Sequence, residues 1–165
     1  PRWLFLYPGA ILAIVSLIQL VVSQLNPSGL GRWPVGIHTQ LFASAGLVLG
    51  YQTMLFAMGA MLARSYARLN APHARERWIL RLSSTPLLWI VGTLFSVTGA
   101  GLCISLAWQW GSTGFGALSP EEAMRRIIPG VALLLIGTQS LLAMVFFAAM
   151  QSAFDSSLRT EPTLP

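Results

Sequence analysis

The sequence contains no lysine, a single aspartate at Asp155, and charged residues at only 9% of its 165 positions. An ordinary soluble domain devotes about a quarter of its residues to charge, so this chain lacks the polar residues needed to cover a water-exposed surface. Hydrophobic residues supply 55% of the chain instead. The composition therefore excludes an ordinary soluble domain and predicts an integral membrane protein.

The residue types that usually carry chemistry are also scarce. Cys103 is the only cysteine, which excludes an intrachain disulfide and a cysteine zinc site. The apolar runs contain no paired carboxylates, so an acid/base pair or a metal–nucleotide site has no donors there. The two histidines, His38 and His73, are expected on opposite sides of the membrane, where they cannot share a metal. We therefore predict no catalytic residue and no metal site, and the lack of an ionisable group within a span disfavours a pump or secondary transporter.

Four apolar runs are each long enough to cross a bilayer, which requires about 20 residues in a helix. We predict an all-α integral membrane fold with four transmembrane helices in a module of residues 1–154, followed by a polar cytoplasmic tail at 155–165. The predicted spans are residues 3–22, 37–63, 87–108 and 127–147. The first run follows Pro1 directly, without a charged leader, which favours a piece of a longer polypeptide over a secretory signal.

The arginines are unevenly distributed among the connections. The first connection, residues 23–36, carries only Arg32, and the third, residues 111–126, balances two arginines against two glutamates. The middle connection, residues 64–85, carries five arginines and one glutamate. Because basic loops remain on the cytoplasmic side, we predict that the middle loop and both termini face the cytoplasm. Orientation in the bilayer explains the net charge of +5, so nucleic acid is not expected as a partner.

The middle loop has a pattern of its own. Trp78 and Leu82 lie one helical turn apart with arginines interspersed, which is typical of a short basic helix on the membrane surface. Anionic lipid is the ordinary partner of such a helix, and a pyrophosphate lipid head or a partner domain is the specific alternative. The candidate contacts in this loop are Arg75, Arg77 and Arg81.

The third connection ends in a helix-start signal. Ser119 can cap the helix, Pro120 suits its first turn, and Glu122 completes a capping box. Glutamates at 121 and 122 then lie four residues before Arg125 and Arg126, at a spacing that allows ion pairs. A solvated helix entry is the simpler interpretation, and contact of Arg125 or Arg126 with a lipid phosphate is the alternative.

Two similar polar breaks interrupt the second and fourth runs: GYQT at positions 50–53 and GTQS at positions 137–140. Their alignment pairs Gly50 with Gly137 and Gln52 with Gln139, and it predicts two related helical hairpins. A two-span unit repeated once keeps its orientation, so the halves are expected to be related by an axis along the membrane normal.

Small and polar residues in these runs are candidates for packing or for a site. Gly46 and Gly50 form a G-x-x-x-G pair that allows another helix to approach closely. The two glutamines have two interpretations: hydrogen bonds across a helix interface, or a polar site near the midplane for a lipid-linked substrate. At the start of the second span, a histidine is expected to be interfacial rather than catalytic. The intramembrane candidates are Gln52, Gln139, Gly46, Gly50, Gly137 and His38.

Three stretches carry a resemblance to a known family: PRWLFLYPGAIL at the start, GIHTQLFASAGLVLGYQTMLFAMGA from Gly36, and GFGALSPEEAMRRIIPGVALLLIGTQSLLAMVFF from Gly114. They resemble the carboxy-terminal membrane region of bacterial family 2 glycosyltransferases, the dolichyl-phosphate-sugar-synthase-like enzymes that act on polyisoprenyl phosphate. The resemblance covers nearly the whole chain up to about Met150. In that family, a cytoplasmic catalytic domain that holds a divalent metal and the nucleotide sugar precedes the spans, and this chain does not contain it.

The resemblance implies a module of the bacterial inner membrane that anchors a glycosyltransferase and positions a lipid phosphate. It implies no cofactor in this chain, and a divalent metal only in the catalytic domain. The implied partners are membrane lipid, polyisoprenyl phosphate, and a glycosyltransferase domain that is either upstream or on a separate chain. The chain alone is not expected to transfer sugar. The alternative is a stand-alone four-span membrane protein that binds or translocates a lipid-linked sugar or another small molecule.

Overall fold

The computed structural model describes residues 2–26, 36–66, 87–116 and 119–160, and every regular element in these ranges is helical. A π-helical turn, η1 (Arg2–Leu6), leads directly into α1 (Tyr7–Leu25). The other helices are α2 (Ile37–Tyr66), α4 (Leu87–Ser112) and α5 (Pro120–Thr160). This architecture confirms the predicted all-α class.

Four of the described helical segments are long and apolar enough to cross a membrane. Their bounds are Leu4–Leu25, Ile37–Arg64, Leu87–Ser112 and Glu121–Ala153. Helix α5 is the longest, with 41 residues, and it continues past the predicted end of the fourth span into residues 155–160 of the predicted polar tail. Backbone hydrogen bonding requires no apolar side chain, so a helix can extend beyond the run that crosses the bilayer.

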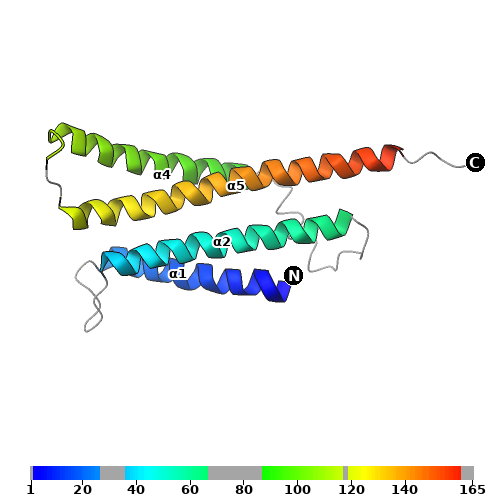
Figure 1. Ribbon diagram of the computed structural model, residues 1–165, viewed down its shortest axis with the longest axis horizontal. Helices are drawn as coiled ribbons and strands as arrows, with labels where there is room; N and C mark the ends of the chain where they lie inside the picture. The colour runs from blue at the N-terminus through cyan, green and yellow to red at the C-terminus, as the bar shows by residue number, and fades with distance from the viewer. Residues whose placement is uncertain (1, 27–35, 67–86, 117–118, 161–165) are drawn as a thin grey trace, which may run out of the picture.

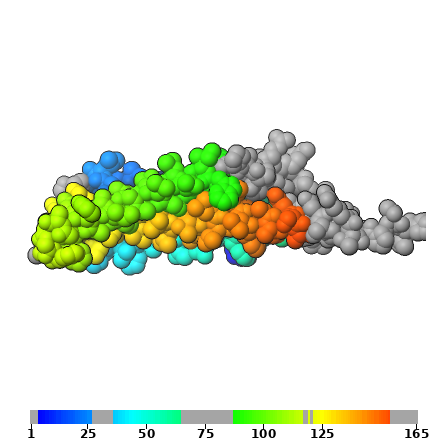
Figure 2. Space-filling model, turned by 90° about the horizontal axis from the view of Figure 1, so that it is seen from above, coloured from blue at the N-terminus to red at the C-terminus, as the bar shows by residue number. Residues whose placement is uncertain are grey.

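The helices form two antiparallel hairpins, α1–α2 and α4–α5, which meet along α2 and α5 (Figure 1). Helices α2 and α5 begin at the same end of the bundle and run in the same direction, whereas α1 and α4 lie on the outside (Figure 1). Viewed from above, α4 rests along the N-terminal part of α5 (Figure 2). The two hairpins thus have the same orientation, as the repeat predicts.

Glycine determines how closely α1 and α2 approach. A Cβ placed on Gly50 would lie 2.6 Å from the backbone nitrogen of Ala13 and 2.7 Å from the carbonyl oxygen of Gly9. In return, a Cβ on Gly9 would lie 3.1 Å from the Cβ of Thr53. The helix backbones are therefore in direct contact, as in other small-residue interfaces within membranes.

The second hairpin repeats this contact with the equivalent residues. A Cβ on Gly137 would lie 2.7 Å from the carbonyl oxygen of Gly92 and would also clash with Ser96. A Cβ on Gly92 would lie 3.0 Å from the Cβ of Ser140. The polar breaks of the sequence thus lie at close backbone contacts within each hairpin.

Large apolar side chains cover the outward faces of the bundle. Ile11 and Ile18 on α1, and Val97 and Ile104 on α4, are each more than half exposed. An apolar surface of this extent is unfavourable in water and suits contact with hydrocarbon. The surface and the helix lengths together are those of a multi-pass membrane protein.

Candidate functional site

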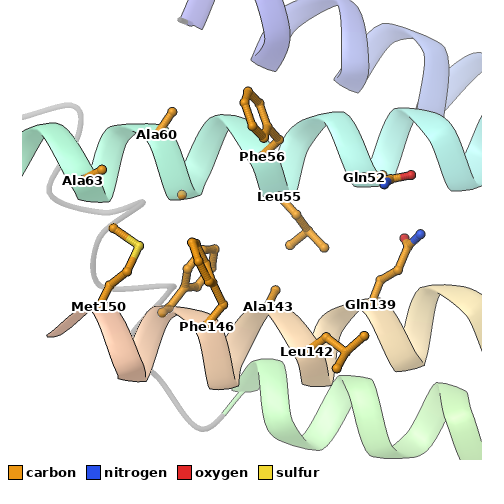
Figure 3. A pocket seen from close by; sticks show the side chains of 12 residues that line it. Gln52, Leu55, Phe56, Ala60, Ala63, Gln139, Leu142, Ala143, Phe146 and Met150 are labelled. Carbon is orange, nitrogen blue, oxygen red and sulfur yellow. The ribbon is translucent and has the colours of Figure 1, made fainter. Parts of the chain in front are cut away.

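An open groove with a volume of about 560 Å³ lies between the C-terminal halves of α2 and α5 (Figure 3). Its walls are almost entirely apolar and include Leu55 from α2 and Ala143 and Phe146 from α5. At 1.5 Å per residue, residues 52–63 of α2 extend about 16 Å along the groove. That length is about half of the roughly 30 Å hydrocarbon core of a bilayer, so the groove matches one leaflet.

The two glutamines singled out in the sequence lie at the same end of this groove (Figure 3). Gln52 is exposed, and Gln139 is half-buried. The Oε1 atom of Gln139 is buried and has no hydrogen-bond partner. The structure therefore brings the repeated glutamines together at the end of an apolar groove, with a buried acceptor left available.

Next to the glutamines, a hydrogen bond joins the two hairpins. The hydroxyl groups of Tyr51 and Ser140 lie 2.6 Å apart. Because Ser140 donates its own hydrogen to the carbonyl of Ile136 at 2.7 Å, Tyr51 is the donor and Ser140 the acceptor. This bond ties α2 to α5 where the groove begins.

A second polar cluster lies towards the opposite end of the bundle and depends on Pro129, which is inside α5. Proline has no N–H, so the carbonyl four residues earlier, that of Arg125, loses its partner within the helix. The side-chain amides of Gln24 and Gln40 both donate to this carbonyl, at 2.9 Å and 3.1 Å. Glutamines from α1 and α2 thus replace the hydrogen bond that the proline removes from α5.

The side chain of Arg125 joins the same cluster. Its Nη1 donates to the carbonyl of Ser23 at 3.3 Å, and its Nη2 pairs with Glu121 at 3.3 Å. The predicted pairing of Glu121 with Arg125 is therefore confirmed. The Arg125 side chain is only 16% exposed, whereas Arg126 is exposed. Of these two candidates for a lipid phosphate, Arg126 is the more accessible.

The entry to α5 follows the predicted start signal. The helix begins at Pro120, and the N–H of Ala123 donates to the carbonyl of Ser119 at 3.2 Å. The Ser119 hydroxyl donates to the carboxylate of Glu122 at 3.0 Å. The two residues of the expected capping box are thus paired through their side chains.

The remaining candidates occupy separate places. Gly46 faces Ser16 across the α1–α2 contact. His38 is exposed in the first turn of α2. Within the described ranges, no group of three or more His, Cys, Asp or Glu side chains could hold a metal ion. The inner-loop candidates Arg75, Arg77 and Arg81 lie outside the described residues.

Sequence reasoning missed Gln24 and Gln40. Both occur near the ends of apolar helices, where a polar residue is unremarkable. The available signal was Pro129, because a proline inside a membrane-spanning helix leaves a carbonyl that needs a donor from a neighbouring helix.

We expect the contribution of Gln40 to depend on Pro129. Gln40→Leu removes one donor from the Arg125 carbonyl and should lower the free energy of unfolding by about 1 kcal/mol. In a Pro129→Ala background, the new N–H can satisfy that carbonyl, so the same substitution should cost less. A double-mutant cycle of unfolding free energies in detergent measures the difference. An equal cost in both backgrounds would show that Gln40 does not replace the missing bond.

The architecture defines the class of protein: a multi-pass membrane protein built from two helical hairpins. The model of the glycosyltransferase family 2 C-terminal transmembrane region matches residues 60–151, more than half of the chain, and the chain belongs to this family. This match confirms the resemblance to the carboxy-terminal membrane region of family 2 glycosyltransferases over residues 60–151. No curated protein and no solved structure matches the chain.

Proposed function

We propose that this chain is the membrane-anchoring and substrate-positioning module of a glycosyltransferase that acts on polyisoprenyl phosphate. It lies in a bacterial inner membrane with both termini in the cytoplasm, and a catalytic domain supplies the metal and the nucleotide sugar. The observation that carries the proposal is the groove between α2 and α5, together with the family to which the chain belongs.

The groove suits the hydrocarbon chain of a lipid substrate. Its wall is apolar and its side is open, so a chain can enter directly from the bilayer without passing through water. Because its length matches one leaflet, we expect the glutamine end to lie near the midplane and the Ala63–Met150 end near the surface. A chain lying in the groove therefore has its phosphate at the membrane surface.

The positive charge near the Ala63–Met150 end of the groove also favours this end as the position of the lipid phosphate. Arg64 follows Ala63 in the last turn of α2, and the predicted orientation places this end at the cytoplasmic face. The basic loop that follows α2 in the sequence begins here. A lipid phosphate at this end meets positive charge on the side where a cytoplasmic catalytic domain would work.

Photolabelling tests the proposal. The full chain, in vesicles containing phosphatidylglycerol, is exposed to a polyisoprenyl phosphate that carries a photoreactive group on its isoprenoid chain. We expect labels on residues 52–63 and 139–150, and we expect excess unlabelled polyisoprenyl phosphate to remove them. Removal of the labels by additional phosphatidylglycerol alone would show an ordinary lipid site and contradict the proposal.

One observation favours the alternative function, translocation of a lipid-linked molecule. A second groove, of about 550 Å³, lies between the N-terminal halves of α2 and α5 and includes Ala45 and Leu135. A translocator needs a path through both leaflets, so labels in both grooves would support translocation. Labels confined to the first groove support positioning for transfer on one side of the membrane.

The glutamines give a sharper test of positioning. Because Gln139 Oε1 has no partner in the bundle, Gln139→Leu and Gln52→Leu should change the melting temperature little. If the glutamine end of the groove limits how deeply the hydrocarbon chain enters, and so fixes the position of the phosphate, sugar transfer by the complete enzyme should fall by about tenfold, which corresponds to roughly 1.4 kcal/mol. Kinetic measurements with purified variants check this. A lower melting temperature with unchanged transfer would instead show that the glutamines hold the helices together.

A further inference from the structure

Helix α5 is too long to be contained within a membrane. Its 41 residues extend about 61 Å at 1.5 Å per residue, whereas a bilayer with its headgroup layers is about 40–45 Å thick. A tilt of about 20°, which is usual for membrane-spanning helices, shortens this reach by only about 4 Å. More than about 10 Å of α5 therefore projects into water.

The excess length is at the C-terminal end of α5. At the other end, the Arg125 carbonyl accepts hydrogen bonds from Gln24 and Gln40, which lie in the last turn of α1 and the first turn of α2. At the C-terminal end, Ala63 of α2 and Met150 of α5 lie at the same end of the groove (Figure 3). Helix α2 ends three residues after Ala63, whereas α5 continues for ten residues after Met150. Helix α5 thus runs on past the end of α2 (Figure 1).

Residues 151–160, called the α5 extension below, are not suited to lie on the membrane surface. Sharp bends in helices occur mainly at proline and glycine, and the extension contains neither. Its one acidic residue, Asp155, balances its one basic residue, Arg159, so it has no net charge to attract it to anionic lipid. The extension therefore continues in line with α5, away from the bilayer.

The α5 extension has the sequence pattern of a helix that docks on a protein. Phe154 and Leu158 follow Met150 at intervals of four residues, so these three positions share one side of the helix. Because Met150 lines the groove, this apolar stripe continues the interface between α2 and α5. Four of the other positions are serine or threonine, which have weak helix propensity. Such a segment is marginal as a helix in water, and burial of its stripe against a partner stabilises it.

We propose that Phe154 and Leu158 of the α5 extension form the docking surface for the cytoplasmic catalytic domain of the enzyme. The family match implies such a domain as a partner of this membrane region. The extension projects at the Ala63–Met150 end of the groove, where the proposed function puts the lipid phosphate. A domain docked there has its active site next to that phosphate. The identity of the partner rests on the proposed function, whereas the surface rests on the length and pattern of α5.

Amide hydrogen exchange in nanodiscs tests the docking surface. We expect the amides of residues 154–160 to exchange at least about tenfold more slowly in the complete enzyme than in this chain alone. The double variant Phe154→Ser and Leu158→Ser should abolish this difference and lower sugar transfer, with the melting temperature of the membrane module unchanged. The matched control is the double variant Asp155→Ser and Arg159→Ser, because these positions lie about 100° further around the helix. It should retain slow exchange.

The other outcomes of this experiment would overturn the proposal. Equal exchange in the complete enzyme and in the chain alone would show that no domain covers the extension. Slow exchange in the chain alone would show that lipid or a second copy covers it instead. Slow exchange that survives Phe154→Ser and Leu158→Ser would show that the stripe is not the contact.

Photolabelling of the groove separates this proposal from the proposed function. Loss of the labels with slow exchange retained in the complete enzyme would contradict the lipid site and support the docking surface. Labels retained with equal exchange would support the lipid site and contradict the docking surface.

Discussion

Gly50→Ala and Gly137→Ala are each expected to destabilise the bundle by about 1–3 kcal/mol, the usual cost of an overfilled contact. At Gly50 the added methyl would meet the backbone of Ala13 and the carbonyl of Gly9 at 2.6–2.7 Å. These are backbone atoms, so relief requires the helices to separate. The two contacts lie in different hairpins, so the losses should add in the double variant. Thermal unfolding of the purified variants in detergent measures each loss of stability.

The matched control is Gly101→Ala on α4. A Cβ at Gly101 meets nothing within 4 Å, so the substitution adds only helix propensity and should stabilise the helix by up to about 1 kcal/mol. Comparison with this control separates the cost of the helix–helix clash from the gain in helix propensity. Equal effects at Gly50, Gly137 and Gly101 would contradict the close packing of the hairpins.

Ala143→Trp is expected to lower sugar transfer by the complete enzyme by about 100-fold, because small displacements of a substrate from its reactive position have effects of this size. Ala143 lies on the wall of the groove between α2 and α5 (Figure 3). An indole at this position occupies the space proposed for the isoprenoid chain. Transfer rates with saturating nucleotide sugar and varied lipid substrate measure the loss.

Ala45→Trp is the control for bulk. Ala45 lines the other groove, between the N-terminal halves of the same helices, so this variant adds the same side chain at the same helix pair. It should retain transfer if the substrate uses only the first groove. Full activity of Ala143→Trp, with a melting temperature near that of the unmodified chain, would show that the lipid substrate does not use this groove.

Composition and run length were sufficient to predict the fold class. A chain with so little charge must bury its backbone hydrogen bonds in helices to cross a membrane, and four runs of adequate length give four helices. The repeated breaks also identified close helix contacts, because Gly50 and Gly137 permit an approach that a residue with a Cβ would prevent. The end of α5 was less predictable, since a polar segment can remain helical outside the bilayer.

The polar clusters could be predicted only in part. The repeat pointed to Gln52 and Gln139 as equivalent positions, but only the arrangement of α2 and α5 shows that they share one groove. Gln24 and Gln40 carry no such signal, because their common partner, the Arg125 carbonyl, is far away in the sequence. A backbone group freed by proline acquires its partner through tertiary contact, which periodicity and spacing do not encode.

The parallel course of α2 and α5 has a mechanical consequence. Within each hairpin, glycine brings the two helix backbones together, so each hairpin is expected to move as a rigid body. Between the hairpins, the amide and hydroxyl bonds described above lie in the N-terminal halves and at the middle of α2 and α5. The groove between the C-terminal halves of these helices has an almost entirely apolar lining. Thermal fluctuation should therefore separate the two hairpins more at the C-terminal ends of α2 and α5 than at their N-terminal ends.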